Sequence, residues 1–308
     1  LTLETEAYTP QTLNVTGTKF NTAKKAAVLV SSKAGANITA SNVDITNVAE
    51  DSENFVWVDE DWAQYFANVE VTGATVRAES AATFTAAITA NGAVQAYYKT
   101  LAEAIAASTP ETGWGGEVTL LKDVTLDGGY ADAGEGLRIE KSVTIIGAGY
   151  TIDCGKFTKG IRIYQNGDLA TNVMFKHTNI VNNNNKGRCI DTRSGKINLM
   201  FNGGVNLTAH GTNSQPLTIG GSEAMTKVTI SGGTIDAGTS GYAVICFVPV
   251  TNHINVQGNA VIKGLAAFYL KEGVTDTAIK LSQSTSIGTN KYSAASGDFG
   301  AIVIEGSN

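Results

Sequence analysis

The chain has 308 residues and a formal net charge of −6; hydrophobic residues make up 43% of it and charged residues 16%. This composition is sufficient for a large core, and the acidic balance without a basic patch argues against a nucleic-acid partner. No apolar run is long enough to cross a membrane, and because the chain begins at Leu1 rather than Met we expect any export signal to have been removed.

The first 92 residues form a β-rich N-terminal region with short strands of loosely repeated pattern. Phe20 and Ile45 lie 25 residues apart, and Ile45 and Val76 lie 31 apart, which is close to a coil-like repeat. We expect this region either to be a separate module or to stack on the C-terminal end of the chain. The predicted strands cover residues 13–20, 27–30, 43–45, 55–58 and 69–76.

Residues 50–62 combine six acidic residues with two tryptophans and no basic residue. Exposed rings beside carboxylates are suited to sugars, because the ring face meets C–H groups and the carboxylates accept hydroxyl hydrogen bonds. The speculative ligand-binding residues here are Trp57, Asp59, Asp61 and Trp62. The alternatives are a Ca²⁺ site formed by the close acids and a solvated loop whose rings pack on the fold.

Residues 93–308 are predicted to begin with a short capping helix at 100–108. Leu101, Ala104, Ile105 and Ser108 fall on one helical face, and Thr100 with Glu103 forms a capping box. Such a helix would cover the apolar end of the first coil of a repeat protein.

From Glu117 onwards the chain repeats a pattern of three short strands seven times. The apolar residues at the centre of each repeat are separated by 25 to 28 residues; they are Leu126, Ile152, Ile180, Leu207, Ile235, Ile262 and Ile287. A single coil cannot bury its own apolar face, but stacked coils can bury a continuous column. The sequence therefore predicts an all-β fold, a right-handed parallel β-helix of about seven three-strand coils.

Residues 97–153 resemble the parallel β-helix modules of adhesin-like bacterial surface proteins, which have the pectate-lyase-like superfold. The motifs that carry the resemblance are Thr-Leu-Ala-Glu-Ala-Ile, Gly-Gly-Glu-Val-Thr-Leu-Leu-Lys-Asp-Val-Thr-Leu and Ser-Val-Thr-Ile-Ile-Gly-Ala-Gly-Tyr-Thr-Ile-Asp. The resemblance implies an extracellular solenoid on a bacterial surface, frequently without enzymatic activity. A superfold alone implies no reaction.

Two pairs of residues could serve a polysaccharide lyase or glycoside hydrolase. Asp127 and Asp153 occupy equivalent places in neighbouring coils and are expected about 5 Å apart, and Arg138 and Arg162 stack in the third strand position. The two pairs are expected on different faces, and the motifs of β-helical pectin hydrolases are missing. We therefore assign no catalytic residue and keep all four as candidate ligand contacts.

No metal or cofactor is expected, because the three histidines lack ligand spacing and the chain has no phosphate loop. Cys154, Cys189 and Cys246 fit small buried hydrophobic residues. The preferred function is a non-catalytic adhesive or structural surface module that binds a surface glycan or a host protein. The alternatives are a polysaccharide-active enzyme and a filament subunit that self-associates through its solenoid ends.

Overall fold

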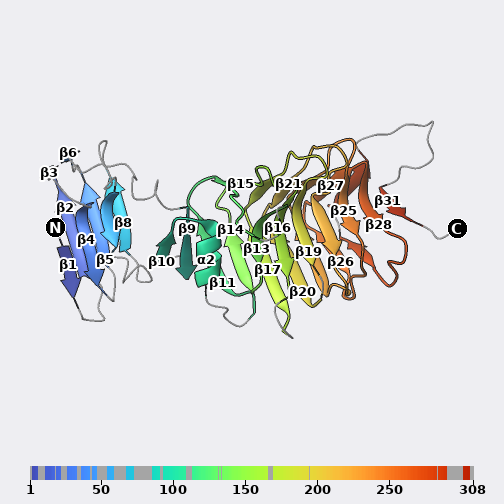
Figure 1. Cartoon of the computed structure of the whole chain (residues 1–308), viewed down its shortest axis with the longest axis horizontal. Helices are drawn as coiled ribbons and strands as arrows, with labels where there is room; N and C mark the ends of the chain where they lie inside the picture. Colours follow the sequence, from blue (N-terminus) through green and yellow to red (C-terminus); the bar gives the residue numbers. More distant parts are fainter. Residues whose placement is uncertain are drawn as a thin grey trace. The chain divides into compact units, whose positions relative to one another are not determined.

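In the computed structural model, the regular secondary structure of the described residues consists of short β-strands and one short helix (Figure 1). The structure describes residues 2–5, 11–17, 19–21, 26–32, 36–41, 44–46, 54–58, 67–72, 85–90, 93–108, 113–130, 132, 134–165, 169–193, 195–282, 284–289 and 301–305. The chain divides into two compact units, one of residues 1–107 and 117–122 and the other of residues 108–116 and 123–308. Each unit is described by itself below.

The larger unit contains three parallel sheets that form a β-solenoid of about six turns. The first sheet contains β14 (Val143–Ile146), β17 (Thr171–Lys176), β20 (Ile197–Asn202), β23 (Lys227–Ser231), β26 (Ile254–Gln257) and β29 (Ile279–Leu281). The second contains β12 (Val124–Thr125), β15 (Thr151–Asp153), β18 (Asn179–Val181), β21 (Asn206–Thr208), β24 (Thr234–Asp236), β27 (Val261–Gly264) and β30 (Ser286–Thr289). The third contains β13 (Glu135–Ile139), β16 (Lys159–Tyr164), β19 (Arg188–Arg193), β22 (Leu217–Gly220), β25 (Tyr242–Cys246), β28 (Ala266–Leu270) and β31 (Ile302–Ile304). The predicted β-solenoid is therefore confirmed.

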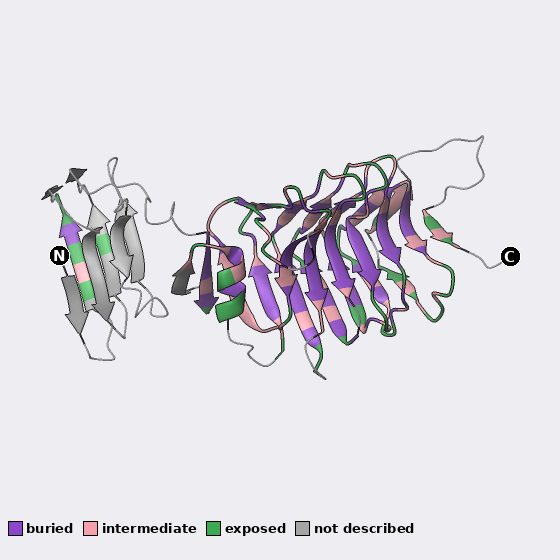
Figure 2. Cartoon of the chain, viewed as in Figure 1, coloured by how far each residue is buried: buried purple, intermediate pink, exposed green. Residues whose placement is uncertain are grey.

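Apolar columns fill the space between the three sheets, because each inward residue stacks on its register partner in the next turn. In the second sheet Ile152 pairs with Ile180 and Ile180 with Leu207, and all three are buried. In the first sheet the rings of Phe175 and Phe201 stack with centroids 6.0 Å apart. Figure 2 shows these strands mostly as buried, with exposed residues concentrated in the connecting loops.

The smaller unit also contains coil-like strands, as the sequence predicted. Its three parallel sheets join β1 (Thr2–Thr5), β4 (Ala26–Ser32) and β7 (Asn54–Val58), then β2 (Gln11–Thr16), β5 (Ala36–Ser41) and β8 (Ala67–Thr72), then β3 (Lys19–Asn21) and β6 (Asp44–Thr46). Phe20 is the register partner of Ile45, so the 25-residue interval in the sequence corresponds to one turn. The two alternatives for residues 1–92, a separate module or a stack on the C-terminal end of the chain, stay predictions.

The same unit contains α2 (Leu101–Ala107), which contacts β9 (Ala86–Ala90) and β10 (Ala93–Tyr98). Strand β9 pairs in antiparallel fashion with β10 and with β11 (Gly116–Leu120). The predicted capping box is present: the Thr100 N–H donates to Glu103 Oε2 at 2.9 Å, and the Glu103 N–H donates to Thr100 Oγ1 at 3.1 Å. The predicted inner face of the helix is buried, whereas its role as a cap on the first coil stays a prediction. Within the described part of the chain, no helix has the length and apolarity needed to cross a bilayer.

Candidate functional site on the outer face of the third sheet

The third sheet carries a row of outward-facing side chains, one from each turn, that changes in character along the solenoid. In a strand, alternate residues point to opposite faces, so the row lies between two inward columns. We call this the central row: Arg138, Arg162, Asp191, Thr218, Ile245 and Tyr269, each the register partner of the next. The row therefore begins charged, becomes polar and ends apolar and aromatic.

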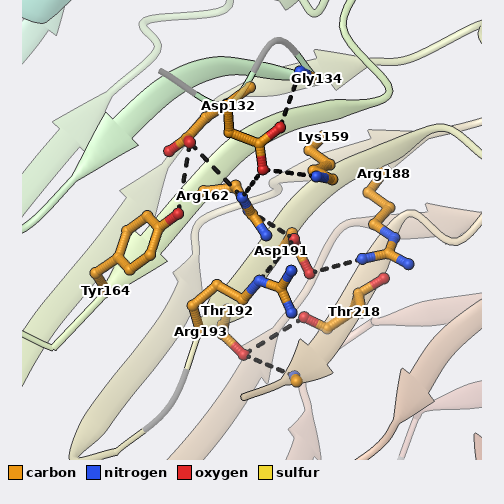
Figure 3. Close-up of polar contacts among 12 residues, drawn as sticks. Asp132, Gly134, Lys159, Arg162, Tyr164, Arg188, Asp191, Thr192, Arg193 and Thr218 are labelled. Atoms are coloured by element: carbon orange, nitrogen blue, oxygen red, sulfur yellow. Dashed lines mark hydrogen bonds and ion pairs between the residues drawn. The ribbon is translucent and has the colours of Figure 1, made fainter. Parts of the chain in front are cut away.

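Arg162 is the centre of the charged part of the row, and its side chain is only 3% exposed. Its Nη1 lies 2.6 Å from Asp132 Oδ2, and its Nε lies 2.9 Å from Asp191 Oδ2 (Figure 3). A buried guanidinium requires such partners, because an unpaired buried charge is strongly unfavourable. The two carboxylates therefore hold Arg162 in place between a loop and the next turn.

Asp191 is fully buried and is shared by three arginines. Besides Arg162, the Arg188 Nη1 donates to its Oδ1 at 3.1 Å, and the Arg193 Nε lies 3.6 Å from its Oδ2 (Figure 3). The side chains of Arg188 and Arg193 are 25% and 38% exposed, so they extend from this buried carboxylate to the surface.

Arg138 is held differently, by a bidentate pair and by aromatic rings. Its Nε and Nη2 each lie 3.0 Å from a Glu135 oxygen, and its guanidinium lies 5.4 Å from the ring centre of Tyr130 and 4.9 Å from that of Tyr164. The hydrogen bond with Glu135 raises the pKa of Arg138, so this group is permanently charged. At Asp132, hydrogen bonds from Lys159 and from the Gly134 N–H hold the carboxyl pKa well below its usual range.

Counted over the residues that the structure describes, the charged cluster has a small positive excess on an acidic protein. It contains five cations, Arg138, Lys159, Arg162, Arg188 and Arg193, and four carboxylates, Asp132, Glu135, Glu140 and Asp191. Every one of these carboxylates is ion-paired. These carboxylates therefore serve to hold the arginine and lysine side chains in place. A general acid, by contrast, must carry a proton near neutral pH.

An aromatic cluster follows in the later turns of the same sheet. The rings of Tyr242 and Tyr269 lie 4.2 Å apart between centroids, and the Tyr269 hydroxyl lies 3.2 Å from Glu305 Oε1. Lys271 pairs with Glu305 at 2.8 Å, and Phe247, just after β25, is 41% exposed. Exposed rings beside charged groups suit a sugar, because the rings can pack on its apolar C–H groups and the charged groups can hydrogen-bond its hydroxyls.

The outer faces of the other two sheets have amide ladders in the corresponding places. Asn198 Nδ2 donates to Asn172 Oδ1 at 2.7 Å on the first sheet, and Asn206 Nδ2 donates to Asn179 Oδ1 at 2.9 Å on the second. In these ladders the side-chain amides form hydrogen bonds with the amides of neighbouring turns. Among the described residues, the combination of clustered arginines and aromatic rings is therefore a property of the third sheet.

The sequence predicted part of this site. Arg138 and Arg162 are register partners in the third sheet, as predicted, and they lie in a different sheet from Asp153, also as predicted. The predicted pairing of Asp127 with Asp153 is wrong, because the register places Thr125 opposite Asp153. Asp153 Oδ1 instead accepts from the Gly155 N–H at 2.8 Å, which stabilises the turn after β15.

The predicted ligand-binding residues of the acidic, aromatic segment lie outside the described part of the structure. Trp57 belongs to β7, but its side chain lies outside what the structure describes, and so do Asp59, Asp61 and Trp62 entirely. Their proposed roles in binding a glycan stay predictions.

Sequence reasoning missed most of the charged cluster. Asp132, Glu135, Lys159, Arg188, Asp191 and Arg193 join it from neighbouring turns and from the loop before β13. The repeat offered a signal for Asp191, because it follows Ile190 as Arg138 follows Leu137 and Arg162 follows Ile161. Asp132 offered none, since the connection between the second-sheet and third-sheet strands differs in length and sequence from turn to turn.

The three cysteines are free and buried, as predicted. Burial raises the pKa of Cys246 to about 12, so its thiol is unreactive in the folded protein. Over the residues that the structure describes, no group of three or more His, Cys, Asp or Glu side chains could hold a metal ion.

The fold defines the class of protein: a β-solenoid with three parallel sheets and a charged, partly aromatic outer face on one of them. The chain matches no family model, no curated protein and no solved structure.

Proposed function

We propose that this chain is a non-catalytic binding module of a bacterial surface and that its third sheet holds an extended glycan. The observation that carries the proposal is the joint presence of the charged cluster and the aromatic cluster on one outer face. The resemblance of residues 97–153 to adhesin-like surface modules supports an extracellular location.

The spacing of the face suits a linear ligand. Neighbouring turns lie about 4.8 Å apart, so the six members of the central row extend over roughly 24 Å along the solenoid. Four members of the row, Arg162, Asp191, Thr218 and Ile245, are themselves buried. A glycan that runs along this face would therefore meet the partly exposed guanidinium groups of Arg138, Arg188 and Arg193 first and the rings of Tyr269 and Phe247 later. Several weak contacts that act together give useful affinity without a deep pocket.

The state of the carboxylates favours binding over catalysis. Asp191 and Glu135 are fully buried and each is paired with arginine, so neither can reach a glycosidic bond. A glycoside hydrolase requires two carboxyl groups that face the same bond, one of them protonated. At Asp132, hydrogen bonds from Lys159 and from the Gly134 N–H instead lower the carboxyl pKa, so this group carries no proton to donate near neutral pH.

The experiment is a glycan array with the wild-type chain and two variants. The double variant Phe247→Ala/Tyr269→Ala removes rings from the third sheet, and Met200→Ala/Asn255→Ala is a matched control on the outer face of the first sheet. We expect binding that the first variant weakens at least tenfold and the control leaves within twofold. Equal binding by all three chains would contradict the proposal, and release of reducing ends from a bound polysaccharide would favour the enzyme.

A second candidate function is end-to-end assembly, which the last described strands favour. Ile302 is 42% exposed although it occupies the same column as fully buried Phe268, and Ile304 and Leu281 are also exposed. We propose that a second copy covers these core positions in a filament. Light scattering over a concentration series checks this: assembly predicts growth in mass, whereas a constant monomer mass contradicts it.

A further inference from the structure

Two of the three buried cysteines lie in neighbouring turns of the solenoid, near the corner between the second and third sheets. Cys154 directly follows β15, and Cys189 belongs to β19 in the next turn. Both side chains are fully buried, and both thiols are free in the structure. Cys246 lies in β25, two turns beyond Cys189 and roughly 10 Å from it. A spacing of one turn is within the reach of a disulfide bond, whereas a spacing of two turns is not.

Gly160 makes room for the sulfur atom of Cys154. Its place in the parallel register of β16 and β19 is opposite Cys189. A Cβ added to Gly160 would collide with Cys154 Sγ, so this sulfur occupies the place that a side chain at position 160 would take. Cys189 supplies the next side chain of the same column, about 4.8 Å along the solenoid. The two sulfur atoms therefore occupy successive places in one column of stacked side chains.

The two thiols also interact with each other in the reduced protein. Burial, together with a hydrogen bond to the Cys154 thiol, raises the pKa of Cys189. The Cys189 Sγ lies 3.4 Å from the carbonyl oxygen of Ile180 and 3.4 Å from that of Thr208. The Thr208 oxygen also accepts the backbone N–H of Asn182, so it keeps a partner when the sulfur turns towards Cys154. A bond between the two sulfur atoms therefore leaves this buried carbonyl satisfied.

We propose that Cys154 and Cys189 are the site of a disulfide bond that joins two successive turns of the solenoid. The inference is independent of the proposed binding and assembly functions, because it rests on the core alone. Gly160 stands two residues before Arg162, and Cys189 stands two residues before Asp191. The bond therefore adds a covalent link between the two turns whose buried ion pair centres the charged cluster.

The bond forms by thiol–disulfide exchange with a small disulfide such as glutathione disulfide. One cysteine thiolate attacks the small disulfide and expels a glutathione thiolate, and the second cysteine thiolate then attacks the mixed disulfide and expels the other. Two cysteines are oxidised, one glutathione disulfide is reduced, and the two cysteine protons pass to the two glutathione thiols. Because both sulfur atoms are buried in the folded chain, the exchange takes place during folding, before the turns close.

The test is refolding of the full chain from urea with either glutathione disulfide or dithiothreitol, followed by alkylation in denaturant and measurement of the intact mass. After oxidising refolding we expect one alkylated cysteine, Cys246, and a proteolytic peptide pair joined through Cys154 and Cys189. After reducing refolding all three cysteines should be alkylated. Three alkylated cysteines after oxidising refolding, a glutathione adduct that does not close, or a bond to Cys246 would each overturn the site.

A second arm tests when the bond forms. Glutathione disulfide added to the folded, reduced chain should leave all three cysteines open to alkylation over the time in which oxidising refolding is complete. Closure of the bond at the same rate in the folded chain would overturn its assignment to folding.

Three variants locate the effect on stability. The oxidised wild type should unfold at a temperature about 5–15 °C above the reduced wild type, because the bond joins positions 35 residues apart and restricts the unfolded chain. Cys154→Ala and Cys189→Ala should each abolish this difference, whereas Cys246→Ala, which removes a thiol that is also fully buried, should retain it. Each comparison is made between two redox states of one chain, so the cost of the substitution cancels. A difference that survives in Cys154→Ala or Cys189→Ala would overturn the proposal.

Discussion

At the scale of single residues, the buried carboxylate of Asp191 has the greatest influence on the third sheet. It neutralises Arg162 where neither group contacts bulk water, so the geometry of the pair is fixed by several partners at once. A buried ion pair adds little net stability over apolar packing, but the loss of one partner leaves the other charge unpaired.

We therefore expect Asp191→Ala to lower the free energy of unfolding by about 3–5 kcal/mol. The matched control is Asp153→Ala, which removes an exposed carboxylate that accepts one turn hydrogen bond, at a cost of about 1 kcal/mol. Urea unfolding followed by circular dichroism measures both. Similar losses in the two variants would show that the buried pair is not special.

A separate prediction concerns how the contribution of Asp132 to the free energy of unfolding depends on pH. Its pKa is lowered in the folded chain by Lys159 and by the Gly134 N–H, so its contribution to stability is present above the unfolded pKa and is lost as the pH falls below about 4. The carboxylate is partly exposed, so solvent screening keeps the contribution below about 1 kcal/mol.

The measurement compares the wild type with Asp132→Asn from pH 7 to pH 3. The difference in unfolding free energy should be largest at neutral pH and should shrink in acid, because the variant has no proton to bind at this position. A difference that stays constant across the range contradicts the assignment of the shifted group to Asp132.

At the scale of strands, burial depends on the place of a turn in the stack. Phe201 in β20 has neighbours in the turns on both sides and stacks on Phe175, whereas Leu281 in β29 is exposed. Phe201→Ala should cost about 3–5 kcal/mol, because it leaves a cavity, and Leu281→Ala about 1 kcal/mol or less. Thermal and urea unfolding measure both, and equal losses would mean that β29 is covered in solution.

The strands also show how far the sequence could be read. Inward columns such as Ile152, Ile180 and Leu207 repeat with the period of a turn, so the fold was predictable from spacing alone. The register at the first turn was not, because β12 is only two residues long and pairs Val124, not Leu126, with Ile152. A two-residue strand carries too little alternation to define its own register.

The candidate site was less predictable than the fold. Arg138 and Arg162 lie in repeated positions and could be aligned, but their partners Glu135 and Asp132 come from a strand start and a loop.

At the scale of the whole solenoid, each turn is a separable unit because it contacts mainly its neighbours. Deletion of residues 234–260 removes β24, β25 and β26, and it brings Val261 to the place of its register partner Thr234. We expect a folded chain with one turn fewer and a urea m-value lower by about one tenth, since m follows the surface exposed on unfolding. Loss of the β-sheet circular dichroism signal would contradict this modularity.

The direction of the hydrogen bonds between turns gives the solenoid a particular response to force. In parallel sheets these bonds point from strand to strand, which is along the axis of the stack. Tension along the axis acts on every interface between turns in series, and we expect the terminal turn, which has a neighbour on one side only, to separate first. Each released turn frees about 27 residues, or roughly 90 Å of extended chain, in place of a rise of about 5 Å. A β-solenoid loaded in this way behaves as an extensible tether, lengthening in steps and dissipating energy at each one.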